Sequence, residues 1–134
     1  MPTTVPLWTP TPQRVADALI TAFARKAESR HRVKLPDYAS LWRWSVDHPE
    51  AFWRDLWDDA GVIGDPGARV LVDADRMPGA RFFPDAKLNF AENLLRRKDG
   101  GLAVVFRGED KIERTLTWVQ LHDAVSRVQQ ALAA

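Results

Sequence analysis

The sequence predicts a helix-rich α+β fold, with N-terminal helices around an aromatic core, then a short β-hairpin and a final helix. Apolar residues recur at helical spacing through the first sixty residues and again after Thr117. Between these stretches, runs rich in β-branched and aromatic residues at 102–107 and 111–116 flank Gly108-Glu109-Asp110, a pattern typical of a hairpin. A chain of 134 residues with 46% hydrophobic and 28% charged residues is long enough to bury a core of its own.

The first helix is expected from Pro12 to about Ser29. Thr11 can cap it, and proline is tolerated in a first helical turn. Its apolar stripe would contain Val15, Leu19, Ala22 and Phe23, with the stem of Lys26 at the edge. The charged stretch 28–36 predicts a loop.

Two tryptophan-rich helices should follow, one from about Asp37 and one from Pro49 to Gly61, which form a corner at Asp47-His48. The apolar face of the second helix would be Tyr38, Leu41, Trp42, Ser45 and Val46, and that of the third would be Phe52, Trp53, Leu56, Trp57 and Ala60. This spacing favours core packing of Trp42, Trp53 and Trp57 over stacking on bases or on the adenine of CoA. Trp44 lies off the stripe, which predicts that it packs on a partner domain outside the chain.

The rest of the chain predicts shorter elements. Residues 61–67 should form a loop, residues 70–72 a short strand, and residues 76–87 an irregular segment with its aromatic side chains turned inward. Asn89, with Glu92 three residues later, predicts a helix to about Arg97. Thr117 and Gln120 repeat that capping signal for the final helix, whose stripe is Leu121, Ala124, Val125, Val128 and Leu132.

No residue pattern in the chain indicates a catalytic, cofactor or metal site. His31, His48 and His122 lack the spacing of a metal-binding motif. Gly61, Gly64 and Gly67 resemble a phosphate-binding run, but no strand precedes them and the run contains an aspartate and a proline, so a plain loop is favoured.

Two charged clusters have structural interpretations. Asp73, Asp75 and Arg76 are expected to be surface charges at the end of a strand. The basic triplet Arg96-Arg97-Lys98 suits the negative end of a helix dipole better than a phosphate.

Composition excludes several classes of protein. The 19 basic and 18 acidic residues argue against a nucleic-acid-binding protein, and the absence of cysteine excludes disulfides and thiolate metal sites. Apolar runs are far shorter than the ~20 residues that cross a bilayer. Residues 1–10 do not resemble a signal peptide, so we expect a cytoplasmic protein without a membrane partner.

Three stretches resemble the N-terminal region of acetoacetyl-CoA synthetase, an acyl-adenylate-forming ligase related to acetyl-CoA synthetase. They read PLWTPTP at 6–12, LWRWSVDHPEAFW at 41–53 and DRMPGARFFPDAKLNFAENLL at 75–95. Arg114 to Leu121 resembles the entry into the large adenylating domain that these ligases share. The resemblance implies that residues 1–98 are the N-terminal region and that residues 99–134 begin a truncated AMP-binding domain.

The implied activity belongs to the parent enzyme, which would convert acetoacetate, ATP and CoA to acetoacetyl-CoA, AMP and pyrophosphate with Mg²⁺. The phosphate-handling motifs of the family lie outside these 134 residues, so the resemblance implies that this segment is inert, binds no cofactor and braces the rest of the adenylating domain. Other hypotheses remain open at this stage: a free-standing protein-interaction module, the N-terminal region of an acetyl- or propionyl-CoA synthetase, and a small binding domain for CoA or a nucleotide.

Overall fold

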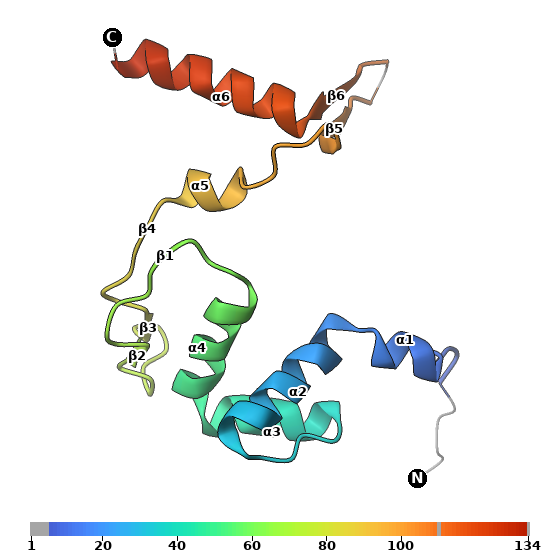
Figure 1. Ribbon diagram of the computed structural model, residues 1–134, viewed down its shortest axis with the longest axis vertical. Helices are drawn as coiled ribbons and strands as arrows, with labels where there is room; N and C mark the ends of the chain where they lie inside the picture. The colour runs from blue at the N-terminus through green and yellow to red at the C-terminus, as the bar shows by residue number, and fades with distance from the viewer. Residues whose placement is uncertain (1–5, 110, 134) are drawn as a thin grey trace. The chain divides into compact units, whose positions relative to one another are not determined.

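The computed structural model describes residues 6–109 and 111–133 (Figure 1). The chain divides into two compact units, residues 1–87 and residues 88–134. The sequence-based division at 98/99 concerns the borders of the parent enzyme's domains, and it stays a prediction. The helical content and the small antiparallel strand pairs agree with the predicted helix-rich α+β class.

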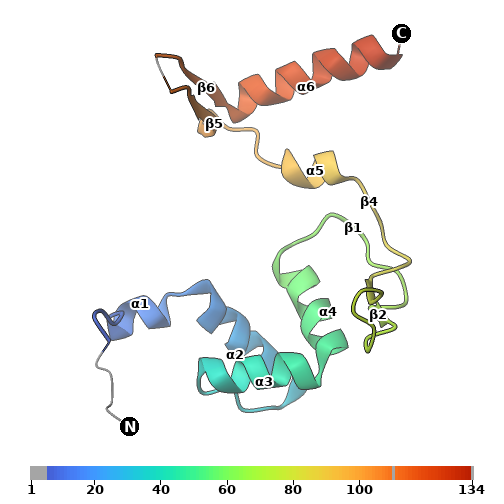
Figure 2. The same cartoon turned by 180° about the vertical axis from the view of Figure 1, so that it is seen from behind.

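The first unit contains four helices: α1 (Pro12–Ala16), α2 (Leu19–His31), α3 (Tyr38–Asp47) and α4 (Pro49–Asp59). Figures 1 and 2 both show α2, α3 and α4 side by side. Thr11 caps α1 as predicted, accepting a hydrogen bond from the Arg14 amide. The prediction of a loop from residue 28 was wrong, because α2 continues to His31 and ends on a left-handed Arg32.

The single helix predicted from Pro12 to Ser29 was also wrong. The backbone leaves the helical conformation at Ala18, which is extended and starts α2. The hydroxyl of Thr21 donates to the carbonyl of Val15 at 2.6 Å, so the break leaves this carbonyl satisfied. Val15 and Leu19 are exposed in consequence, and only the later part of the expected stripe reaches the core.

Helices α3 and α4 begin as predicted. The Asp37 carboxylate accepts from the Ser40 amide at 2.8 Å, and the Asp37 amide donates to the Ser40 hydroxyl at 3.2 Å, which completes a capping box. Hydrogen bonding by Ser40, by its amide first and then by its side chain, lowers the pKa of Asp37. Pro49 opens α4, and Gly61 follows its end in a left-handed conformation.

The core of the first unit is aromatic, as expected, but the predicted places of Trp42 and Trp44 were wrong. Trp44 is only 6% exposed, and its ring lies 6.3 Å from that of Phe52, whereas Trp42 is 49% exposed. Around the helix axis of α3, Trp42 and Trp44 lie on opposite sides of Leu41. The helical period alone therefore allows either tryptophan to face the core together with Leu41. Contacts with α2 and α4 select the Trp44 side. The buried members are Phe23, Ala27, Leu35, Leu41 and Trp44, with Ala24, Val33, Ala51, Phe52 and Leu56 packed around them.

The two tryptophans of α4, Trp53 and Trp57, contact the segment that follows this helix. Trp53 is 37% exposed rather than central in the core, and its ring centroid lies 5.1 Å from that of Phe82. The ring centroid of Trp57 lies 4.7 Å from that of Phe83. The two pairs hold residues 82–83 against α4, as expected of an irregular segment with inward aromatic side chains.

Short strands follow α4. Strand β2 (Leu71–Val72), close to the predicted 70–72, pairs antiparallel with β3 (Arg81–Phe82). Strand β1 (Gly64–Asp65) pairs with β4 (Lys87–Leu88). The sequence did not predict β1, β3 or β4, because two-residue strands have no periodicity to detect.

The second unit contains α5 (Phe90–Leu94), the hairpin strands β5 (Leu102–Arg107) and β6 (Glu113–Thr117), and α6 (Trp118–Ala133). Helix α5 is capped by Asn89 as predicted but ends three residues before Arg97. The hairpin is confirmed, although β6 begins two residues later than expected, and the predicted turn residue Asp110 lies outside the described residues. The amide of Gln120 donates to the hydroxyl of Thr117 at 3.2 Å, which confirms the second capping signal.

Candidate functional site

The most buried charged group among the described residues is Asp55, which is 7% exposed. It lies on α4 and faces the end of α2. One carboxylate oxygen accepts from Arg30 Nη1 at 2.6 Å, and the other lies 2.8 Å from His31 Nε2. A buried carboxylate requires such partners, because an unpaired buried charge is costly. This cluster therefore joins α2 to α4.

Further ion pairs surround this buried carboxylate. Arg30 also donates to Asp58 at 3.0 Å, and Lys26 pairs with Asp59. Hydrogen bonds to Asp55 first, and then to Asp58, raise the pKa of Arg30. Arginine is charged at all ordinary pH values, so Arg30 cannot act as a general base. The contacts of the cluster connect α2 to α4.

This cluster was not predicted from the sequence. His31 was predicted to lie in a loop, so its contact with Asp55 on α4 was not expected. The available signal was charge complementarity: basic residues at 26 and 30 on one helix and acidic residues at 55, 58 and 59 on another.

The three histidines lie in separate surroundings. His31 contacts Asp55 and stacks near Trp44, with ring centroids 5.1 Å apart. The ring centroid of His48 lies 6.4 Å from that of the same indole, and His122 Nε2 lies 2.6 Å from the carbonyl oxygen of Leu95 in the second unit. Within residues 6–109 and 111–133, no group of three or more His, Cys, Asp or Glu could hold a metal ion.

Within the glycine run of residues 61–67, Gly67 allows a backbone conformation and a close contact that other residues would not allow. Gly67 has a φ of 72°, and a β-carbon placed there would lie 2.6 Å from the β-carbon of Asp85. Its amide donates to Asp65 Oδ1 at 2.9 Å. Only glycine allows this close approach without strain.

Asp85 is also paired, which leads to a prediction. Arg69 Nε donates to its carboxylate at 2.8 Å, and this hydrogen bond is the main cause that lowers the pKa of Asp85. We expect Arg69→Met to raise that pKa towards its ordinary value, as measured by carboxyl-carbon NMR titration. Because the folded-state pKa is the lower one, the stabilisation from the pair is present at neutral pH and is lost as the pH falls through the folded-state pKa.

Arg81→Met is the matched control for this titration, since Arg81 affects Asp85 only through a weaker charge interaction. Its effect on the midpoint should be clearly smaller. Equal midpoints in the two variants would show that the hydrogen bond from Arg69 is not the cause.

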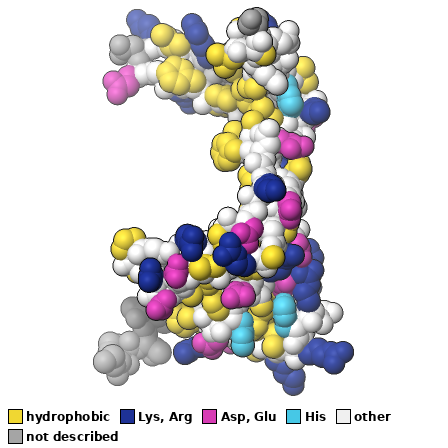
Figure 3. Space-filling view, turned by 90° about the vertical axis from the view of Figure 1, so that its left-hand side faces the viewer, with side chains coloured by type: hydrophobic (Ala, Val, Ile, Leu, Met, Phe, Trp, Pro, Cys, Tyr) yellow, Lys and Arg dark blue, Asp and Glu magenta, His cyan; other side chains and the backbone are white. Residues whose placement is uncertain are grey.

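The remaining charged candidates have surface roles. Asp73 accepts from Arg81 at 3.4 Å. Arg96 donates to the carbonyl of Asn93 at 3.1 Å, near the end of α5, where a basic residue was expected. Arg97 forms a two-point pair with Asp99 and lies 5.4 Å from the ring centroid of Trp118, so it does not act at the helix end. On the face drawn in Figure 3, acidic and basic side chains are interspersed.

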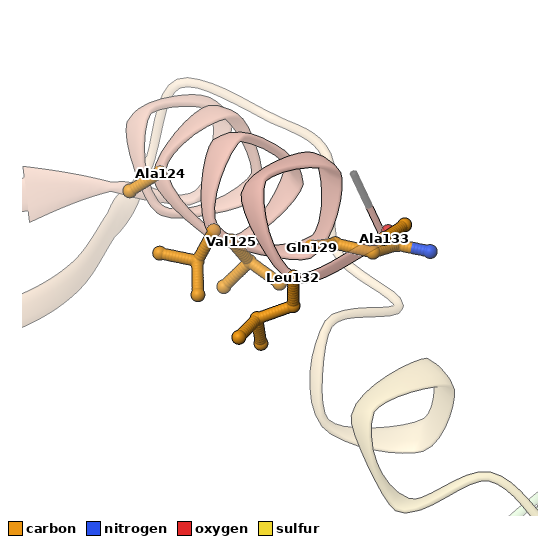
Figure 4. Close-up of a pocket in the computed structure, with 6 residues that line it drawn as sticks. Ala124, Val125, Gln129, Leu132 and Ala133 are labelled. Carbon is orange, nitrogen blue, oxygen red and sulfur yellow. The ribbon is translucent and has the colours of Figure 1, made fainter.

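Apolar surface is exposed in the second unit. Hairpin residues Val104, Phe106 and Leu116 are partly exposed, as are Val125 and Val128 of α6. Helix α6 has a shallow groove lined by Ala124, Val125, Val128, Gln129, Leu132 and Ala133 (Figure 4). No helix within the described part of the chain is long and apolar enough to cross a membrane.

Comparison with known proteins accounts for this combination of elements. Residues 38–94 match the family model of the acetyl-coenzyme A synthetase N-terminus. An acetoacetyl-coenzyme A synthetase of Rhizobium meliloti (strain 1021) is 47% identical over 129 residues, which are 96% of this chain and 20% of that protein. The chain is homologous to the N-terminal region of acetoacetyl-CoA synthetases. This confirms the resemblance inferred from the three sequence stretches.

A solved structure and a second curated relative also match this chain. The structure of acetoacetyl-CoA synthetase from Streptomyces lividans matches 97% of this chain and 21% of its own chain, with a TM-score of 0.81 and 38% identity. A malonamoyl-CoA synthetase of Penicillium aethiopicum is 33% identical over 121 residues. The chain spans 20% of the length of the Rhizobium meliloti relative and 17% of the length of the Penicillium aethiopicum relative.

Proposed function

We propose that the chain is the N-terminal region of an AMP-forming acetoacetate–CoA ligase and that it contributes structure rather than chemistry. The observation that carries the proposal is the 47% identity with an acetoacetyl-coenzyme A synthetase over 96% of the chain. The packing of the first unit supports a structural role. Asp55, Arg30 and His31 satisfy one another between two helices, and Trp44 fills the core beside them.

The parent reaction would proceed in two steps. The carboxylate of acetoacetate attacks the α-phosphorus of ATP, which forms an acyl-adenylate and releases pyrophosphate. The thiolate of CoA then attacks the acyl carbon and displaces AMP. Developing charge on the phosphate would be stabilised by Mg²⁺ and a lysine. We assign these groups, and all contacts with ATP, CoA and acetoacetate, to parts of the parent enzyme outside residues 1–134. A cytoplasmic location is proposed with this activity.

The proposal also names the acid that the parent enzyme activates. The relative from Rhizobium meliloti is named for acetoacetate and the one from Penicillium aethiopicum for malonamate, so relatives of this region differ in the acid that they activate. We favour acetoacetate because the relative named for it has the higher identity. An acetyl- or propionyl-CoA synthetase remains the alternative.

The test uses the full-length polypeptide translated from the reading frame that encodes these residues. We expect acid-dependent exchange of labelled pyrophosphate into ATP, fastest with acetoacetate and slower with acetate or propionate. The isolated 134-residue chain should form no acyl-adenylate with any of the three acids.

Each other outcome has a defined meaning. Faster exchange with acetate or propionate would favour the alternative ligase. Acyl-adenylate formation by the homogeneous 134-residue chain would contradict the structural role. A reading frame without further coding sequence after residue 134 would favour a free-standing interaction module, for which the exposed Tyr38, Trp42 and Val46 of α3 are the candidate surface.

A further inference from the structure

The last two turns of α6 present an aliphatic surface that the described residues of the second unit leave open. Val128 is 60% exposed and Leu132 is 84% exposed. Both line the groove with Val125. Figure 4 shows Val125 and Leu132 on the same side of the helix. Apolar side chains gathered on one helix face at this exposure need a cover.

This surface continues a stripe that is already partly used. Leu121, Val125, Val128 and Leu132 are spaced by four, three and four residues, which places them on one side of α6. At the start of the helix, Leu121 and His122 are half-buried, and α6 contacts β5 and β6. The stripe therefore begins on the hairpin and extends beyond it.

The chemistry of the groove indicates what kind of surface would cover it. Its lining contains no charged and no aromatic residue, and the charged pair Asp123–Arg127 is not part of it. Transient interfaces are enriched in aromatic residues and arginine, whereas permanent contacts resemble the core of a domain. The exposed row of α3 has the first composition, because Arg43 lies 5.4 Å from the ring centroid of Trp42. The α6 groove has the second.

We infer that the aliphatic face of α6 is part of a hydrophobic core that is completed by the polypeptide following the homologous region in acetoacetyl-CoA synthetases. This inference rests on the proposed function, and it names the surface and the partner. The chain spans about a fifth of its relatives, so their remaining length can supply the cover. The hairpin supports the same conclusion, because two strands alone are marginal in water and Val104, Val105 and Phe106 are exposed on both faces.

The experiment is hydrogen exchange on the full-length polypeptide, with amides 121–132 as the readout. We expect strong protection in the unsubstituted protein and clearly weaker protection in the isolated chain. Val128→Asp should accelerate exchange on the order of a hundredfold, because it buries an unpaired charge. The control is Gln130→Asp, which places the same charge two residues away on the opposite side of α6 and should leave exchange within a few fold.

The outcomes separate this inference from the proposed function. Acetoacetate-dependent exchange of pyrophosphate, together with unprotected α6 amides and equal behaviour of the two variants, would overturn the inference and leave the function standing. Protection that rises with protein concentration would assign the face to a second copy and also overturn the inference. Protection in a monomer that activates no acid would support the buried face and reject the ligase.

Discussion

Replacing Trp44 by alanine is expected to lower the free energy of unfolding of the first unit by about 3–5 kcal/mol, as large aromatic deletions in cores do. The indole is 6% exposed, and it contacts the rings of Phe52 and His31 from α4 and α2. Its removal leaves a cavity where three helices meet. Denaturant unfolding followed by near-ultraviolet circular dichroism measures the loss.

Trp42→Ala is the matched control, because Trp42 lies two residues away on the same helix and is 49% exposed. We expect Trp42→Ala to lower the free energy of unfolding by less than half as much, because Trp42 buries less apolar area when the chain folds. Equal midpoints for the two variants would show that the core is not organised around Trp44.

Replacing Asp55 by asparagine is the second large effect expected, about 1–3 kcal/mol of destabilisation. The substitution keeps the volume but removes the charge that Arg30 and His31 share. Arg30 is half exposed and retains Asp58, so its own desolvation adds little to the cost. The same unfolding measurement applies.

Asp58→Asn is the control for this substitution. Asp58 accepts from the same guanidinium group at 3.0 Å, but its side chain is 49% exposed. Exposed pairs contribute little, so we expect a change of less than about 1 kcal/mol. If Asp58→Asn costs as much as Asp55→Asn, the buried position of Asp55 has no special role in joining α2 to α4.

Local signals in the sequence predicted much of this fold. Asn89 and Thr117 were identified as helix starts because a capping side chain acts within one turn of the helix. Pro49 and Gly61 predicted both ends of α4, because proline suits a first helical turn and glycine readily adopts the left-handed conformation that follows a last turn. The hairpin followed from two runs rich in β-branched and aromatic residues separated by a turn.

Features that depend on packing between helices were not predicted. The side of α3 that faces inward is chosen by α2 and α4, so Trp42 and Trp44 could not be told apart from the α3 sequence alone. The Asp55 cluster depends on α2 reaching His31 and on its distance from α4, which no spacing within one helix encodes. The break at Ala18 was not predicted either, because the periodic pattern of apolar residues continues across it.

We propose that residues 1–134 hold a fold and carry out no chemistry. The direct measurement is kcat for acetoacetate-dependent pyrophosphate exchange by the full-length polypeptide in which His31, His48 or His122 is replaced by glutamine. Each variant is compared with its own denaturation midpoint. We predict that every variant keeps kcat within about twofold when its midpoint is unchanged. A loss on the order of a hundredfold or more, the contribution of a general acid or base, at an unchanged midpoint would contradict the claim.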